Sequence, residues 1–184
     1  QKSIRGSDVN AAIYYASRLL IAGDLESLTR RLLVTAYEDI GIANPQACMR
    51  TKIAIDSAYT VGLPEAIIPL SVAIVDLCLS PKSKSACLSI ERAMDFNKEM
   101  PLGVLDYLRL TPINIADEDK YPYDYPNVWP HLQYLPELIK NVKFFVPNTN
   151  AESSYEKFLN EQYKKYSSLY KSKNIKDLKT KYSN

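Results

Sequence analysis

Residues 66–79, which read AIIPLSVAIVDLCL, form the longest apolar run of the chain. They are apolar on nearly every side of a helix that opens at Pro64-Glu65, and such a helix is usually the central one of a bundle. Pro69 should kink this helix or leave its first turn irregular, because proline has no backbone donor. The run is too short to span a membrane and contains Asp76. We therefore expect a buried helix.

The flanking helices are marked by glycines and capping residues. Glycine just after an apolar-periodic segment indicates a helix C-cap, because it adopts the left-handed conformation without a Cβ clash. An N-cap residue, alone or followed by proline, marks the start. We expect helices from Ser7 or Asp8 to Gly23, from Asp24 to Gly41, from Asn44-Pro45 to Gly62, and from Ser80-Pro81 to about Lys98. With the apolar run they predict a compact all-α bundle, in a domain of about five to seven helices.

The composition is typical of one folded domain. The chain has 184 residues, of which 46% are hydrophobic and 24% charged. The net charge of +2 does not by itself indicate a nucleic-acid-binding protein. The cysteines, Cys48, Cys78 and Cys87, lack CxxC spacing, which excludes a zinc ribbon and disfavours a disulfide scaffold. Because the first methionine is Met49, we expect a piece of a longer protein.

Residues 101–150 differ from the bundle core that we expect over residues 1–100. Seven of the eleven prolines lie between Pro101 and Pro147, and residues 120–136 read KYPYDYPNVWPHLQYLP. This density of proline prevents a long helix or a central strand, whereas so many aromatic rings require burial. We predict an irregular arm that packs on the same domain or on another subunit. A short helix at about 103–110 and one short strand at Val142–Val146 are expected within it.

Residues 151–184 form a lysine-rich tail with eight lysines and four acidic residues. A narrow seam recurs at alternating spacings of four and three, which predicts an amphipathic helix from about 152 to 171. The seam consists of Tyr155, Leu159, Gln162, Tyr166 and Leu169. Two interpretations stay open: the lysines and interleaved tyrosines contact nucleic acid, or the seam packs on a neighbour. Lys164 and Lys165 are the candidate DNA or anion contacts of this tail.

The sequence contains no motif for phosphate or metal chemistry. A phosphate-binding loop needs two glycines five residues apart, and the glycines here are at least 17 apart. His131 is the only histidine, whereas histidine-based metal sites need two or three. We interpret His131 as structural. We expect these residues to hold no catalytic site, no metal and no cofactor.

Glu38 and Asp39 end the second expected helix. Negative charge at that end opposes the helix dipole, so a basic residue such as Arg5, Arg18 or Arg31 should compensate. We favour a structural or interface ion pair. A general acid–base pair and a solvated helix end are the alternatives.

Lys82 and Lys84 fall in the first turn of the helix expected from Ser80-Pro81. Free backbone amides and two lysines at this place suit an anion such as a DNA phosphate. Cations are disfavoured at this helix end, and a solvated turn is the alternative. A DNA-binding hypothesis therefore combines Lys82 and Lys84 with the lysine-rich tail.

Short motifs follow one another in an ordered set. They are Ile4-Arg-Gly-Ser-Asp8, Asn10-Ala-Ala-Ile-Tyr-Tyr15, Arg30-Arg-Leu-Leu33, Glu38-Asp-Ile-Gly41, Asn44-Pro-Gln-Ala47, Gly62-Leu-Pro-Glu65, Ser80-Pro-Lys-Ser83, Pro101-Leu, Tyr123-Asp-Tyr-Pro126 and Gln133-Tyr-Leu-Pro136. Over about residues 2–149 the set resembles the C-terminal region of the RarA/MgsA family. These are AAA+ ATPases of replication-fork maintenance, related to the Werner helicase-interacting protein. The tail lies outside the resemblance, and Tyr123 stands where the family has histidine.

The resemblance implies a fold and a function. The fold is a helical domain like the clamp-loader collar, which assembles the protein into a homotetramer. ATP and Mg would bind in an ATPase core upstream, and the parent protein would be a DNA-stimulated ATPase. It would associate with single-strand-binding protein and work in the cytoplasm, at the nucleoid, with no membrane partner. We thus expect an oligomerisation domain, whose candidate interface residues are Glu38, Asp39, Tyr121, Tyr123, Tyr125, Trp129 and Tyr134.

Overall fold

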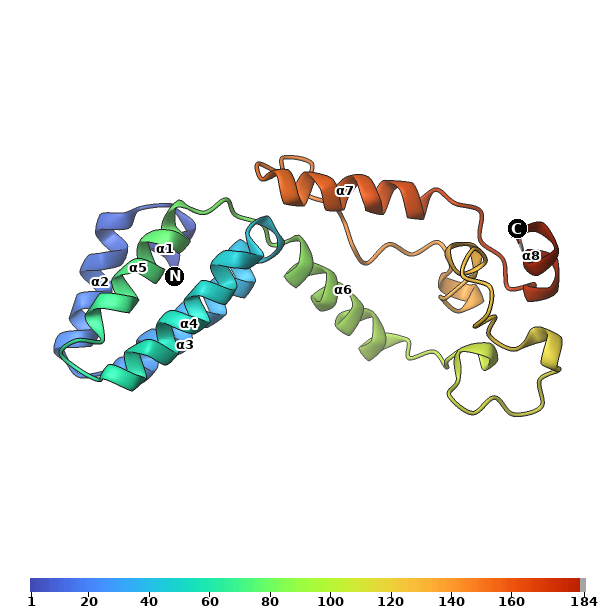
Figure 1. The fold of residues 1–184 in the computed structure, drawn as a ribbon, viewed down its shortest axis with the longest axis horizontal. Coiled ribbons are helices and arrows are strands. Elements are labelled where there is room, and N and C mark those ends of the chain that lie inside the picture. The colour runs from blue at the N-terminus through green and yellow to red at the C-terminus, as the bar shows by residue number, and fades with distance from the viewer. Residues whose placement is uncertain (183–184) are drawn as a thin grey trace. The chain divides into compact units, whose positions relative to one another are not determined.

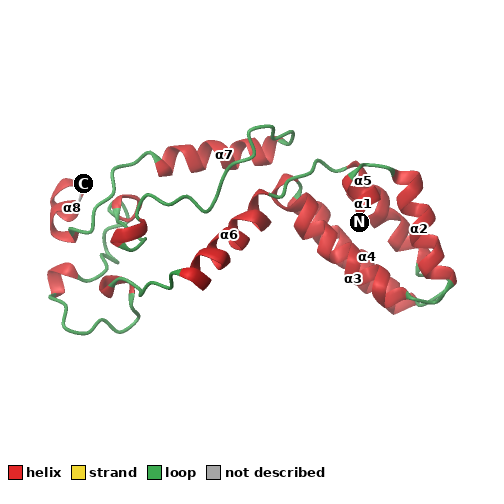
Figure 2. Cartoon of the chain, turned by 180° about the vertical axis from the view of Figure 1, so that it is seen from behind, coloured by secondary structure: helices red, strands yellow, loops and turns green. Residues whose placement is uncertain are grey.

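The computed structural model describes residues 1–182, whose regular secondary structure is all helical, with a largely irregular stretch over residues 100–153 (Figure 1, Figure 2). Its eight α-helices are α1 (Lys2–Arg5), α2 (Val9–Ile21), α3 (Leu25–Thr35), α4 (Pro45–Val61), α5 (Ile67–Leu79), α6 (Ser85–Glu99), α7 (Ser154–Ser167) and α8 (Ile175–Tyr182). A π-helical turn, η1 (Ala36–Ile40), follows α3, and single 3-10 turns follow at Gly41–Ala43, Asp106–Leu108, Asp117–Asp119, Trp129–His131 and Glu137–Ile139. Among the described residues no strand forms, so the all-α prediction is confirmed.

Helices α2, α3 and α4 begin where the capping residues predict. The side chains of Asp8, Asp24 and Asn44 each accept a hydrogen bond from the backbone amide three residues on, at 2.9, 3.0 and 3.3 Å. Gly23 and Gly62 end α2 and α4 in left-handed conformation, with φ of +73° and +72°. Local sequence therefore sets the starts of these three helices and the ends of α2 and α4.

Helix α5 is the central helix of the bundle, as the apolar run predicts. Leu70, Leu77 and Cys78 are fully buried and share one hydrophobic core with residues of α1–α4. The helix begins at Ile67 after an irregular segment over 62–66, so Pro69 lies in its first turn, where it removes no helical hydrogen bond. The short α1 was not predicted, and it adds Ile4 to this core.

The fifth helix of the predicted bundle is placed differently. Helix α6 begins at Ser85, and the described core of α1–α5 contains none of its residues. The prediction of Ser80-Pro81 as its cap and first turn was wrong. Ser80 instead ends α5, because its hydroxyl donates to the carbonyl of Asp76 at 2.7 Å and its backbone is extended.

The chain forms two compact units, each built from two separate stretches. The first contains residues 1–91 and 145–160, and the second contains residues 92–144 together with the chain from 161 onward. These units do not coincide with the consecutive parts 1–100, 101–150 and 151–184 that composition suggested. The start of the tail belongs with the bundle, whereas α8 belongs with the arm.

The second unit has a small core of its own. Tyr107, Val128 and Leu132 of the arm are buried together with Ile175 and Leu178 of α8. A single parallel bridge joins residues 132 and 172. The proline-rich arm is thus an ordered structure that closes around a helix of the tail.

Three details of the arm and tail were predicted wrongly. The expected helix at about 103–110 is only the 3-10 turn Asp106–Leu108, and Val142–Val146 is irregular. The expected helix over 152–171 ends at Ser167, and α8 follows it separately. A strand needs a neighbouring strand to complete its backbone hydrogen bonds, and no strand is assigned within the described residues.

Candidate functional site

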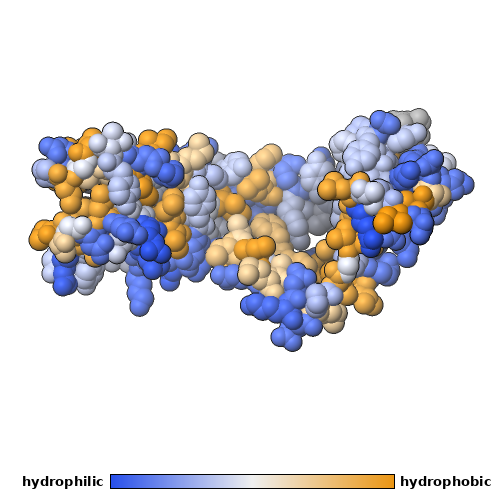
Figure 3. Space-filling view, turned by 90° about the horizontal axis from the view of Figure 1, so that it is seen from below, coloured by the Kyte–Doolittle hydropathy of each residue, from blue (hydrophilic) through white to orange (hydrophobic). Residues whose placement is uncertain are grey.

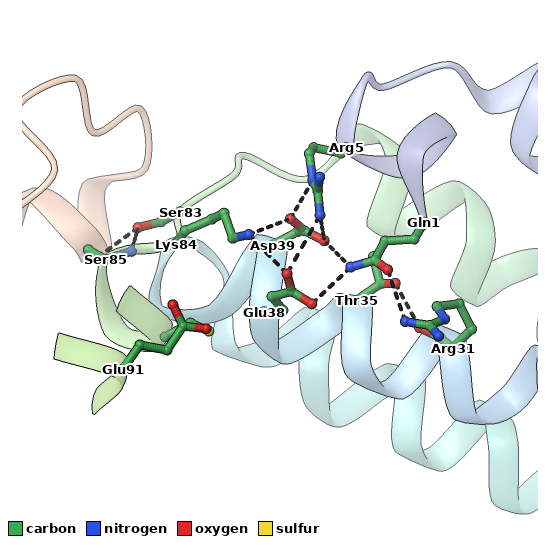
Figure 4. Close-up of polar contacts among 11 residues, drawn as sticks. Gln1, Arg5, Arg31, Thr35, Glu38, Asp39, Ser83, Lys84, Ser85 and Glu91 are labelled. Carbon is green, nitrogen blue, oxygen red and sulfur yellow. Dashed lines mark hydrogen bonds and ion pairs between the residues drawn. The ribbon is translucent and has the colours of Figure 1, made fainter. Parts of the chain in front are cut away.

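A polar cluster surrounds Glu38 and Asp39 in the bundle (Figure 4). Both lie in η1, and π-helical turns often occur at functional sites. The side chain of Asp39 is 1% exposed, and its Oδ1 accepts a hydrogen bond from Nε of Arg5, in α1, at 2.7 Å. Glu38 forms an ion pair with Nζ of Lys84 at 2.9 Å. The cluster therefore joins α1, η1 and the connection before α6.

The partners keep both carboxyl groups ionised. Burial opposes the charge of Asp39, but hydrogen bonds from Arg5 and Gln1 outweigh this effect and lower its pKa below the usual value. The hydrogen bond from Lys84 lowers the pKa of Glu38. A general acid or base works best with a pKa near the operating pH. The geometry therefore favours the ion-pair interpretation over acid–base catalysis.

The compensating cations were predicted only in part. Arg5 is confirmed as a partner of Asp39. Arg31 instead donates to the side-chain oxygen of Gln1 at 3.0 Å. Lys84 is the cation that sequence reasoning missed, because it lies 46 residues from Glu38 and no local pattern connects the two.

A close backbone contact lies directly behind this cluster. The amide of Ser83 donates to the carbonyl of Asp39 at 2.8 Å. Gly41 has φ of +48°, and a Cβ atom there would lie 3.2 Å from the carbonyl oxygen of Ser83. Glycine is therefore required on two counts, conformation and space. The contact fixes the connection between α5 and α6 against η1.

Lys82 and Lys84 are placed differently from the sequence prediction. Both precede α6, so neither lies in the first turn of a helix. Nζ of Lys82 donates to the carbonyls of Cys78 and Ser80 at 2.9 and 2.6 Å, and desolvation lowers its pKa. The predicted placement was wrong because Lys82 caps the end of α5 while Lys84 pairs with Glu38. A DNA contact by either lysine stays a prediction.

Glu156 is a buried carboxylate that sequence reasoning also missed. It lies in α7, is fully buried, and its Oε1 accepts hydrogen bonds from the hydroxyls of Ser83 at 2.5 Å and Ser85 at 3.4 Å. Asn148 donates to its other oxygen at 3.4 Å. The contact with Ser83 spans 73 residues, so only the three-dimensional structure reveals it. Glu156 anchors the start of α7 to the bundle.

The arm aromatics form a cluster in the second unit. The ring of Tyr121 stacks on Trp129 with centroids 6.5 Å apart and meets the edge of Tyr123 at 4.8 Å. The hydroxyl of Tyr134 donates to the carbonyl of Trp129 at 3.1 Å and lies 3.3 Å from that of Tyr121. Burial, reinforced by Tyr121, raises the pKa of Tyr134. Tyr123 is 73% exposed and Tyr125 38%, so the cluster also presents surface.

Lys164 and Lys165 of the tail are exposed. Lys164 and Lys165 lie in the last turn of α7, where positive charge suits the helix dipole, and Lys165 lies 5.4 Å from the ring centre of Tyr166. In the second unit, Lys179 lies 5.5 Å from the ring centre of Tyr125. The tail thus brings cations to aromatic rings, although Lys176 of α8 pairs with Glu118 at 3.3 Å.

The histidine and the two buried cysteines are held by packing and hydrogen bonds within the fold. The ring of His131 stacks on Tyr182 with centroids 3.7 Å apart, and its Nδ1 lies 3.0 Å from the carbonyl of Tyr170. Burial raises the pKa of the Cys48 and Cys78 thiols, which keeps them protonated. In residues 1–182 no three His, Cys, Asp or Glu side chains gather to hold a metal ion, and no helix has the length and apolar character to cross a membrane.

Comparison with known proteins places these features in a family. Residues 6–167 match the family described as MgsA AAA+ ATPase C terminal. The chain belongs to this family. The match extends through α7, so the view that the tail beyond residue 150 lies outside the family was wrong.

Relatives of this chain include proteins named for replication-associated recombination. The chain is 48% identical over 172 residues to Replication-associated recombination protein A of Bacillus subtilis, covering 90% of the chain and 40% of the relative. It is 32% identical to the protein of the same name from Escherichia coli K12, covering 82% and 36%. ATPase WRNIP1 of Dictyostelium discoideum is 32% identical, covering 78% and 18%. The chain thus spans two fifths or less of the length of these relatives.

Proposed function

We propose that this chain is the C-terminal oligomerisation domain of an AAA+ ATPase that acts in replication-fork maintenance and recombination. It assembles subunits into a homotetramer, so that an ATPase core upstream can act on DNA. ATP and Mg bind in that upstream core, with no cofactor held by residues 1–184. The family membership of the chain supports the ATPase and recombination parts of this proposal.

One observation carries the assembly part: the bundle exposes many large apolar side chains. Apolar surface is visible on the bundle at the left in Figure 3. Ile21 of α2 is 86% exposed, Ile53 of α4 64%, and Val72 and Leu79 of α5 65% and 67%. Exposed apolar surface on this scale marks a protein-interaction site in folded proteins. A domain that assembles subunits needs such a surface.

The arm contributes a second candidate interface. Tyr121, Trp129 and Tyr134 hold the arm itself together, while Tyr123 leaves most of its ring exposed. Aromatic anchors commonly dominate the energy of an interface. Tyr123 is therefore the arm residue best placed to contact a second subunit, and Glu38 and Asp39 act indirectly by holding the bundle in shape.

The test is the solution mass of the chain, measured by size exclusion with light scattering over a concentration series. We expect a mass near four times the 20.9 kDa of one chain. Replacing Tyr123 with Ala should lower the mass at low concentration without changing the circular dichroism spectrum. A monomer at every concentration would overturn the assembly proposal.

The full-length protein supplies the remaining partners. We infer that it binds DNA at single-strand/duplex junctions or ends, associates with single-strand-binding protein, and works in the cytoplasm at the nucleoid. The names of the relatives, which concern replication-associated recombination, support this inference.

A second candidate function is DNA or replication-protein binding by the tail. The observation that favours it is the cation–ring pairing of Lys179 with Tyr125 and of Lys181 with Tyr170, at 5.5 and 5.2 Å. Lysine and aromatic side chains together bind single-stranded nucleic acid in other proteins. Exposed Lys164 and Lys165 would extend the surface.

Its test is the retardation of a labelled forked oligonucleotide at several salt concentrations. We expect affinity to fall steeply with salt, and replacement of Lys164 and Lys165 with Glu to reduce binding and the salt slope. No retardation by micromolar protein at low salt would overturn the candidate.

A further inference from the structure

Two neighbouring helices of the bundle present one outward face. Helices α4 and α5 run antiparallel and are joined across their outer side by Arg50 and Asp76, whose Nε and Oδ2 atoms lie 2.8 Å apart. Apolar side chains flank this ion pair on both helices, each 59–67% exposed. They are Met49, Ile53, Ile68, Val72 and Leu79.

Within each helix, the spacing of these side chains places them along one side. Met49 and Ile53 are one turn apart on α4, Ile68 and Val72 are one turn apart on α5, and Leu79 lies two turns further on. A shallow pocket beside the ion pair is lined by Arg50 of α4 and by Ser71, Val72, Val75 and Asp76 of α5. The face therefore consists of two apolar ridges with a charged pair in the groove between them.

The size of the face suits a protein partner. Five large side chains at about three-fifths exposure leave on the order of 500 Å² of mainly apolar surface, which is as large as the largest patch on a typical monomer. A standard interface buries about 800 Å² per partner. The apolar area of this face, together with the polar residues around it, approaches that area. Helices of 17 and 13 residues also have the length of those in four-helix bundles.

The charges indicate which partner fits. In a twofold interface the same patch lies on both subunits, so residue i contacts residue j and residue j contacts residue i. The groove holds one positive and one negative side chain, and Arg50 retains 51% exposure while Asp76 retains 24%. A twofold axis through this groove places unlike charges opposite each other, whereas a partner with a single sign of charge would meet repulsion. The face is complementary to itself.

We propose that α4 and α5 form a twofold interface with a second copy of this chain, in which Arg50 of each copy contacts Asp76 of the other. The inference rests on the proposed assembly function and specifies the surface that performs it. Two helix pairs then pack as a four-helix arrangement around a central ring of four alternating charges.

The test uses two single variants, Arg50→Asp and Asp76→Arg, alone and mixed. Each variant alone places like charges in the groove, so we expect its self-association to weaken by about tenfold or more, equivalent to about 1.4 kcal/mol. In the mixture, Arg50 of one variant faces Asp76 of the other, and the new Arg and Asp side chains face each other. Light scattering of the mixture should therefore show the wild-type mass again.

Matched variants separate the possible outcomes. The same exchange at Arg30 and Glu26, an exposed pair of α3, should leave the mass unchanged. Val72→Lys alters an exposed side chain without disturbing the core and should also lower the mass. Circular dichroism confirms that each variant is folded.

The inference fails if both charge variants keep the wild-type mass, or if both dissociate and mixing does not restore assembly. In either case a wild-type oligomer would still support the assembly function through another surface. A monomeric wild-type chain would instead overturn the assembly function itself.

Discussion

Asp39 illustrates how one residue organises its surroundings. Its side chain is almost fully buried, it pairs with Arg5, and its backbone carbonyl accepts from Ser83. A buried carboxylate depends on its partners, because an unpaired charge inside a protein is strongly unfavourable. The stability of the bundle should therefore respond both to the removal of this charge and to pH.

We expect Asp39→Asn to lower the free energy of unfolding by about 2 kcal/mol at pH 7, since it removes a charged hydrogen bond at a buried site. The folded-state pKa lies below the ordinary value of 3.8, so the contribution of Asp39 is complete above about pH 4 and is lost as pH falls through the folded-state value. The difference between wild type and variant should thus shrink toward about pH 2.5. Urea denaturation at both pH values measures it.

The matched control is Asp56→Asn, because Asp56 is 60% exposed and pairs with Lys52 on the surface. It should change the unfolding free energy by less than about 0.5 kcal/mol. Equal losses in the two variants at pH 7, or a pH-independent difference for Asp39→Asn, would contradict the role of Asp39.

Gly41 provides a second prediction at this scale. Replacement with Ala forces a side chain into a conformation that L residues rarely adopt and brings Cβ to 3.2 Å from Ser83. We expect a loss of about 1–3 kcal/mol of stability, measured by thermal or urea denaturation. Gly103 has an ordinary φ, and a Cβ atom there would meet no other atom within 4 Å, so Gly103→Ala should be nearly neutral. If Gly41→Ala kept the wild-type stability, the close approach of Ser83 to Gly41 would not require glycine at this position.

Local signals predict the helix ends of the bundle, and distant contacts decide the rest. Asp8, Asp24 and Asn44 act as caps within one turn, so their helices were predictable from sequence. The start of α6 was not, because the hydroxyl of Ser80 and the ammonium of Lys82 bind carbonyls at the end of α5 instead. The same two residues would suit a helix N-terminus if no such partners existed.

The candidate site shows the same division between local and distant information. The acidic pair Glu38 and Asp39 and the cation Arg5 were predictable from residue type and position. The roles of Lys84 and Glu156 were not, because their contacts span 46 and 73 residues. Periodicity describes which face of a helix is buried, and it contains no information on such pairings.

The buried carboxylate of Glu156 should determine the order of the first turns of α7. Glu156→Ala removes the buried carboxylate that accepts from the hydroxyls of Ser83 and Ser85, which then keep their 2.8 Å contact with each other, at a cost of about 1–3 kcal/mol. This loss of stability should be confined to the first turns of α7, and the backbone amides there should exchange with solvent about tenfold faster or more. Hydrogen exchange followed by mass spectrometry measures this.

The control for α7 is Glu161→Ala, which changes an exposed acid in the same helix. Its exchange should match the wild type. If exchange rises equally in both variants, helix propensity and not the buried anchor determines the order of α7.

The two compact units lead to a prediction for the whole molecule. The first has an extensive core, and the second has a small one that includes Leu178 of α8. Leu178→Ala should destabilise the second unit by about 2–5 kcal/mol. Trp129 is the only tryptophan and lies in the second unit, where Nε1 donates to the carbonyl of Pro122 at 2.8 Å. Its fluorescence should report the unfolding of that unit at lower urea concentration.

Leu32→Ala is the converse control, because Leu32 is buried in the core of the bundle. It should shift the helical circular dichroism transition while the Trp129 fluorescence transition stays in place. Coincident transitions in both variants would mean that the two units unfold as one cooperative system.

The sequence separation between Ser83 and Glu156 also determines when their contact can form during protein synthesis. Ser83 leaves the ribosome 73 residues before Glu156 does, and at about 5–20 residues per second this interval lasts roughly 4–15 s. For that time the nascent bundle holds two hydroxyls without their carboxylate. The hydrogen bonds between Glu156 and the bundle therefore form only after the whole arm has been translated.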